Sequence, residues 1–179
     1  MKKDLNFISI KDFTTESGYY YPSFELSYQV FGEPIHTAPT VLVNHALTGN
    51  SNVAGKDGWW NSLIGPGKVI DTNHYAVIAF NVPGNGYDEK QENLIENYED
   101  FNARDIAELY GRALSQLGIE KLYAAIGGSL GGGIAWELAF AFPDLIENLI
   151  PVASDWKASD WILAHNKTQL QILSNSSQP

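Results

Sequence analysis

The chain has 179 residues, of which 44% are hydrophobic, and its formal net charge is −10. This length suffices for one domain with a real core, and the acidic balance argues against nucleic acid or an anionic membrane surface as a partner. The absence of cysteine excludes disulfides, thiolate metal sites and a cysteine nucleophile. No signal-peptide pattern follows the first lysines, and no run approaches the roughly 20 apolar residues of a membrane span, so we expect a cytoplasmic protein.

Strands are predicted at the start of the chain and again from Thr40 onward. The segment from Leu5 to Phe31 has the aromatic and β-branched content of two strands around a turn at ESGYYYPS. Four later runs are short and apolar, and each stops at polar or glycine residues: TVLVNHALTG, YAVIAFNVPGNG, KLYAAIGGS and NLIPVAS. Apolar runs without alternation are typical of strands buried on both faces, as in a parallel sheet.

Helices are predicted between the later strands. In FNARDIAELYGRALSQLGI, apolar residues recur at spacings of three and four and form one stripe: Ile106, Leu109, Tyr110, Ala113, Leu114 and Leu117. Gly118 is expected to end this helix. A second helix, LGGGIAWELAFAFP, ends at Pro143. The alternation predicts an α/β fold with a mostly parallel sheet flanked by helices and antiparallel strands at the N-terminus.

One serine lies between two pairs of glycines where a predicted strand meets a predicted helix. Gly127 to Gly131 reads GGSLG, which matches the pattern G-x-S-x-G. At such a junction the motif is typical of a nucleophile elbow, a strained turn that exposes the hydroxyl of Ser129 above the sheet. The alternatives are a tight loop without chemistry and a phosphate cradle. The flanking strand and helix favour the nucleophile over the loop, and no phosphate-binding glycine pattern fits the chain.

A nucleophilic serine also needs hydrogen-bond donors for the oxyanion that develops on its substrate. In α/β-hydrolases one donor is the backbone N–H that follows the nucleophile, which here belongs to Leu130, at the start of a helix. The other donor comes from the loop after an earlier strand, and NHALTGN offers that loop with the N–H of Leu47 as the candidate. His45, in the same loop, is a candidate base, but shaping the turn is its favoured role.

Four segments resemble a known family. VLVNHALTGN, GWWNSLIGPGKVIDTNHYAVIAFNV, IGGSLGGG and LIPVAS follow one another in the order and spacing of the homoserine O-acetyltransferases, from about Val41 to Ser154. The resemblance implies an α/β-hydrolase-type fold and transfer of an acetyl group from acetyl-CoA to L-homoserine, in methionine biosynthesis. Ser129 would take the acyl group and homoserine would accept it, with Leu47 and Leu130 as oxyanion donors.

The same resemblance implies which molecules the protein meets. The expected partners are small molecules, namely acyl-CoA and a homoserine-like alcohol, with no nucleic acid and no membrane. Acetyl-CoA is a co-substrate, and no bound cofactor and no metal are expected, because no His/Asp/Glu cluster has metal-ligand spacing. Whether the full-length form is a homodimer stays open.

We expect the catalytic triad to be incomplete in this sequence. The triad order in this fold is serine, then an acid, then histidine, and the last two follow later strands. Only His165 follows Ser129, and it lies with Asp155 and Asp160 in a segment that resembles the start of the family's lid. We therefore expect the triad acid and histidine beyond Pro179.

The chain departs from the family's pattern in two further places. NVPGNGYDEK replaces a loop rich in Gly, Ser and Thr, and the place of a substrate-binding arginine falls near Leu170, with no arginine after Arg112. The identity of the molecule that accepts the acyl group therefore stays open. One alternative is an esterase that transfers the acyl group to water, and another is a non-catalytic truncated remnant. Residues 1–154 are expected to form the N-terminal part of the core, and residues 155–179 to begin the lid.

Three other residues have two interpretations each. Trp59 and Trp60 could line a ligand cleft, but packing is favoured because large aromatic side chains are more often packing residues. Asn81 ends the second buried run, and it is expected either to orient an active-site loop or to cap its own turn.

Overall fold

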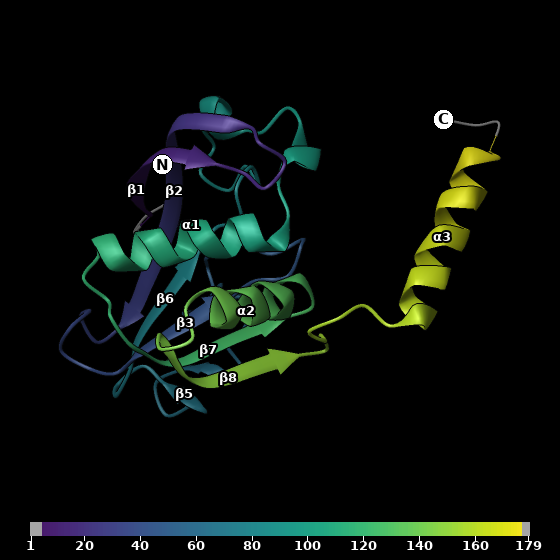
Figure 1. Cartoon of the computed structure of the whole chain (residues 1–179). Helices are drawn as coiled ribbons and strands as arrows, with labels where there is room; N and C mark the ends of the chain where they lie inside the picture. Colours follow the sequence, from purple (N-terminus) through teal and green to yellow (C-terminus); the bar gives the residue numbers. More distant parts are fainter. Residues whose placement is uncertain (1–4, 177–179) are drawn as a thin grey trace.

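The computed structural model describes residues 5–176 and contains a six-stranded mixed sheet with helices against one face (Figure 1). The strand order is β1-β2-β6-β3-β7-β8. These strands are β1 (Asn6–Thr14), β2 (Tyr20–Gly32), β3 (Thr40–Asn44), β6 (Ala76–Phe80), β7 (Leu122–Gly128) and β8 (Ile146–Val152). The helices are α1 (Ala103–Gln116), α2 (Leu130–Ala141) and α3 (Asp160–Ser174), with short 3-10 turns η1 (Gln91–Asn93) and η2 (Tyr98–Asp100).

Antiparallel strands begin the sheet and parallel strands complete it. β1 pairs with β2 and β2 with β6, both antiparallel, whereas β6, β3, β7 and β8 run parallel to one another. The turn between β1 and β2 is shorter than ESGYYYPS, because β2 already begins at Tyr20. Pro22 therefore lies within β2, and it drops out of the ladder opposite Asp12 because proline has no N–H to donate.

Each face of the parallel sheet buries its own apolar layer. On one face, Leu42, Ile78 and Ala125 pack against α1 and α2. On the other face, the apolar side chains of β3, β6 and β7 pack against the connection between β3 and β6, which includes the short strands β4 (Ile64–Gly65) and β5 (Ile70–Asp71). All residues of β3 and β6 are buried, as their unbroken apolar runs predict.

β8 does not follow that prediction. It has the same kind of apolar run as the inner strands, but none of its residues is buried, and Ile150 and Val152 are 43% and 42% exposed. Within the described residues β8 has a neighbour, β7, on one side only. A run of apolar residues indicates a strand, but burial also depends on what packs against it.

α1 begins and ends where the sequence indicates. A capping box starts it: Asn102 accepts from the backbone N–H of Asp105, and the Asp105 side chain accepts from the backbone N–H of Asn102. The predicted stripe faces the sheet, with only Leu117 partly exposed. Gly118, at φ +70°, ends the helix in a conformation that favours glycine.

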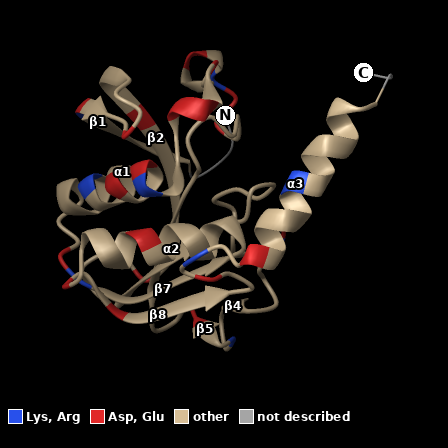
Figure 2. Cartoon of the chain, turned by 45° about the vertical axis from the view of Figure 1, so that its right-hand side comes forward, with Lys and Arg blue, Asp and Glu red and all other residues tan. Residues whose placement is uncertain are grey.

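α3 stands away from the sheet and its two helices (Figure 1). All of its residues are exposed, including large apolar side chains such as Trp161, Leu170 and Leu173. It bears few charged residues, Asp160 and Lys167, as Figure 2 shows. Within residues 5–176, no helix is long and apolar enough to cross a membrane.

Candidate active site

Ser129 occupies a strained turn between β7 and α2. Its backbone has φ +53° and ψ −117°, a region that non-glycine residues rarely adopt and that costs about 1–3 kcal/mol. The surrounding structure holds this turn: the Ser129 N–H donates to the carbonyl of Val152 at 3.0 Å, and its own carbonyl accepts from Gly132 and Gly133 at 3.0 and 3.1 Å. The residue is exposed. The sharp strand-to-helix bend that the sequence predicts is therefore present.

Glycines allow β7, β3 and α2 to meet beside this turn. A Cβ on Gly127 would collide with the backbone carbonyl of Gly131. A Cβ on Gly131 would collide with the carbonyl oxygen of Asn44 and lie 2.7 Å from that of His45. Real Cβ atoms essentially never approach other atoms so closely. The glycines two residues before and after Ser129 are thus required by contact with backbone atoms.

The two predicted backbone donors lie at the edge of the sheet where β3 and β7 end. Leu47 is in the loop after β3, and Leu130 begins α2 after β7. Leu130 is the first residue of α2, so its N–H has no partner within the helix and lies at the positive end of the helix dipole. Leu47 is at the tip of a turn closed by the Gly49 N–H and the Ala46 carbonyl at 2.8 Å, and it is 67% exposed. Asn44 lies opposite Gly127 in the β3–β7 ladder, so the loop with Leu47 and the turn with Ser129 leave the sheet side by side.

His45 is buried, and its ring makes two hydrogen bonds with backbone atoms. Nδ1 lies 2.7 Å from the Ala46 carbonyl oxygen, and Nε2 accepts from the Val82 N–H at 3.0 Å. Burial lowers the pKa of this imidazole below its usual value, although the bond to Ala46 opposes the shift. A neutral ring with both nitrogens occupied supports the favoured interpretation, in which His45 shapes the turn.

The other histidines are not arranged around Ser129. His165 is on α3, where its ring stacks on Trp161 at 5.3 Å and Nε2 lies 3.0 Å from the Gln169 amide nitrogen. His36 is exposed in a turn, and His74 is exposed beside Asp71. Among the described residues, no group of three His, Asp or Glu side chains could hold a metal ion.

The structure separates the roles of the two tryptophans. Trp60 packs against the buried layer formed by β3, β6 and β7, as expected for a packing residue. Trp59 stacks on Trp60 at 4.7 Å but is 39% exposed, and its indole N–H donates to the Asn50 carbonyl at 2.9 Å. Trp59 therefore supports the loop after β3 from outside the core.

Sequence reasoning missed a buried polar cluster below that loop. Ser51 and Gln29 are buried; Ser51 is joined to Asn81 by two hydrogen bonds, and its hydroxyl donates to Gln29. The sequence places Asn81 at the end of a predicted strand and indicates nothing about this cluster. Its partners Ser51 and Ser27 are 30 and 54 residues away in the sequence, and no local pattern links them to Asn81.

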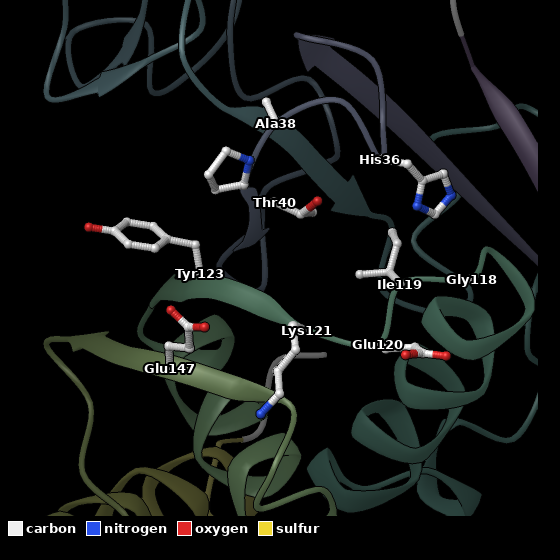
Figure 3. A pocket seen from close by; sticks show the side chains of 10 residues that line it. His36, Ala38, Thr40, Gly118, Ile119, Glu120, Lys121, Tyr123 and Glu147 are labelled. Atoms are coloured by element: carbon white, nitrogen blue, oxygen red, sulfur yellow. The ribbon is translucent and has the colours of Figure 1, made fainter.

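A cavity of about 360 Å³ lies at the opposite edge of the sheet (Figure 3). Its lining includes Thr40, Tyr123 and Glu147, which come from the starts of β3, β7 and β8. Ser129 follows the end of β7, so this cavity is separate from the elbow. Parallel sheets bind ligands at the carboxyl ends of their strands, which is the edge that carries Ser129.

The fold and the elbow together define a class of protein, the α/β hydrolases. A family model described as the alpha/beta hydrolase fold matches residues 39–177, and the chain belongs to this family. The fold class predicted from the sequence is therefore confirmed.

Within this class the chain is similar to homoserine O-acetyltransferases. The homoserine O-acetyltransferase of Haloarcula marismortui is 35% identical over 172 residues, which cover 86% of this chain and 42% of that relative. The crystal structure of homoserine O-acetyltransferase from Staphylococcus aureus superposes with a TM-score of 0.79 at 29% identity, covering 97% of this chain and 53% of that one. Esterase E22 superposes equally well, with a TM-score of 0.79 at 27% identity. The superposition covers 97% of this chain and 54% of the esterase chain. The chain spans about half the length of the relatives it matches.

Proposed function

We propose that this chain is the serine-bearing part of an acyltransferase that moves an acetyl group from acetyl-CoA to L-homoserine, in methionine biosynthesis. The observation that carries the proposal is the backbone of Ser129, exposed and strained between β7 and α2. Such strain persists only where surrounding structure maintains it, and it concentrates at functional sites. The similarity to homoserine O-acetyltransferases supports the choice of acyl donor and acceptor.

The reaction proceeds in two halves. In the first, Ser129 Oγ bonds to the acetyl carbonyl carbon, the C–S bond breaks, and CoA leaves as a thiol carrying the serine proton. In the second, the homoserine hydroxyl oxygen attacks the acyl-serine, its proton returns to Ser129 Oγ, and the acetyl ester of homoserine leaves. Both halves pass through an oxyanion, which the N–H groups of Leu47 and Leu130 would stabilise, each worth about 10²–10³-fold in rate.

The proposal assigns the general base to no residue of this chain. His45 has both ring nitrogens in hydrogen bonds to backbone atoms, and His165 lies on α3, away from the sheet. Removing the histidine of a serine triad lowers kcat by about 10⁶-fold. The chain on its own is therefore expected to acylate slowly and to turn over far more slowly than a complete enzyme.

Ester hydrolysis is the second candidate function. The similarity to esterase E22 is as close as the similarity to the acetyltransferase structure, and Leu170 stands near the place of the family's substrate-binding arginine. The two candidates share the acyl-serine and differ only in whether water or an alcohol accepts the acetyl group.

An acyl-discharge experiment distinguishes the two functions. The chain is loaded with p-nitrophenyl acetate, whose good leaving group needs little acid assistance, and intact mass is followed after excess donor is removed. We expect one acetyl group per chain, faster loss of this group with homoserine than with buffer alone, and no loading of Ser129→Ala. Equal loss with and without homoserine favours the esterase. Rapid formation of O-acetylhomoserine from acetyl-CoA by this chain alone would contradict the missing base.

A further inference from the structure

A buried polar cluster anchors the loop that carries Leu47. We call residues 45–52, which follow β3, the oxyanion loop. Near its end, Ser51 is fully buried; its N–H donates to Asn81 Oδ1 at 2.8 Å, and its hydroxyl donates to Gln29 Oε1 at 2.7 Å. The exposed tip of the loop is thus tied at its base to β2 and to the end of β6.

Asn81 is itself held firmly in place. Its Nδ2 donates to Ser51 Oγ at 3.0 Å and to Ser27 Oγ at 2.9 Å, and its backbone N–H donates to the Ser27 carbonyl at 2.9 Å. The turn after Asn81 is closed by the Asn85 N–H and the Val82 carbonyl instead. Asn81 Oδ1 also accepts from the Asn85 side-chain amide of this turn at 3.2 Å. The other three side-chain hydrogen bonds of Asn81 go to the oxyanion loop and to β2.

The start of the loop is fixed from the same segment. The residue after Asn81 is Val82, whose N–H donates to the His45 ring at 3.0 Å. Two consecutive residues beyond β6 thus hold both ends of the oxyanion loop. Surface loops are generally mobile, whereas an oxyanion donor must be held within about 0.5 Å of its productive place.

We infer that Asn81 is a positioning residue, which acts through Ser51 to hold the N–H of Leu47 where it can meet an oxyanion on Ser129. This inference rests on the proposed function, since it assumes that Ser129 accepts an acyl group. It assigns Asn81 no contact with substrate. Its effect is on the transition state, because only there does the carbonyl oxygen carry the charge that Leu47 would stabilise.

The test compares Asn81→Ala with Ser27→Ala. Asn81→Ala removes both contacts with Ser51, whereas Ser27→Ala removes a bond to the same amide from the other side and leaves the loop contacts in place. Acylation of Ser129 by p-nitrophenyl acetate is expected to slow by about 10- to 100-fold in Asn81→Ala, less than for complete loss of an oxyanion donor, because the Leu47 N–H is displaced and not removed. The concentration of p-nitrophenyl acetate that gives the half-maximal rate should not change. Ser27→Ala should lower the thermal midpoint and leave the acylation rate within about twofold.

Amide hydrogen exchange of residues 46–49 supplies a readout that does not depend on acylation of Ser129. Asn81→Ala should speed exchange in these residues, while exchange in α1 stays as in the parent chain. Asn81→Ser, which keeps a polar group in the buried site, serves if the alanine variant does not fold. Unchanged exchange with an unchanged acylation rate, or an equal slowing in Ser27→Ala, would overturn the positioning role. If the parent chain is not acylated at Ser129, the proposed function fails and the inference fails with it, even where exchange shows that Asn81 anchors the loop.

Discussion

Replacing Gly131 by alanine is expected to lower the free energy of unfolding by about 3 kcal/mol, at the upper end for overpacking a buried site. The added methyl group would collide with the Asn44 carbonyl oxygen and lie 2.7 Å from the His45 carbonyl oxygen. Both are backbone atoms, one in the last residue of β3 and one in the residue that follows it, so no side-chain rotation can relieve the contact. Because these atoms lead into the loop with Leu47, the substitution should also slow acylation of Ser129.

Gly133→Ala is the matched control for this prediction. Gly133 lies in the same helix, two residues further on, and a Cβ built there has no neighbour within 4 Å. Since alanine is the better helix former by about 1 kcal/mol, Gly133→Ala should be neutral or stabilising. Urea denaturation followed by circular dichroism measures both variants. Equal stability of the two would show that β3 and α2 are not in the close contact described.

Two buried asparagines at strand ends, Asn44 and Asn81, differ in their hydrogen bonds. Asn44 is 1% exposed, and its amide nitrogen and oxygen have no hydrogen-bond partner among residues 5–176. Asn81 is also buried, but its amide makes hydrogen bonds with Ser51 and Ser27. Burying a polar group without a partner costs about 1–3 kcal/mol, whereas a satisfied group that is removed leaves its partners unpaired.

Leucine has a branched shape similar to that of asparagine. It should therefore change the free energy of unfolding in opposite directions at the two positions. Asn44→Leu is expected to raise the free energy of unfolding by about 1–3 kcal/mol, and Asn81→Leu to lower it by about 3 kcal/mol. Denaturant midpoints with unchanged slopes would give both values. Destabilisation by both substitutions would mean that the Asn44 amide is satisfied in solution.

The sequence predicted most of the fold because the relevant signals are local. The stripe of α1, its end at Gly118 and the bend at Ser129 are each set by residues within one or two helical turns. The exposure of β8 was not predictable in this way. Its apolar run resembles those of β3 and β6, and the difference lies in which strands stand beside it.

The candidate site was predictable only in part, for the same reason. GGSLG locates the turn with Ser129, and the glycine pattern implies close approach by neighbouring elements. The particular neighbours, the carbonyls of Asn44 and His45, become visible only when β3 and β7 are paired in register. The link between Asn81 and Ser51 likewise joins residues 30 positions apart, and the hydrogen bonds of a buried amide leave no periodic signal.

Both the proposed function and the positioning role of Asn81 require that Ser129 takes the acyl group. Tandem mass spectrometry of proteolytic peptides, after brief exposure to p-nitrophenyl acetate, locates the acetyl group directly. We predict that it lies on Ser129 and that unfolding in urea abolishes this preference for one serine. Ser154 lies against Gly132 in the first turn of α2, and the variant Ser154→Ala should be labelled as the parent chain is. Acetylation spread over lysines and tyrosines, with Ser129 unmodified in the folded chain, would contradict the account.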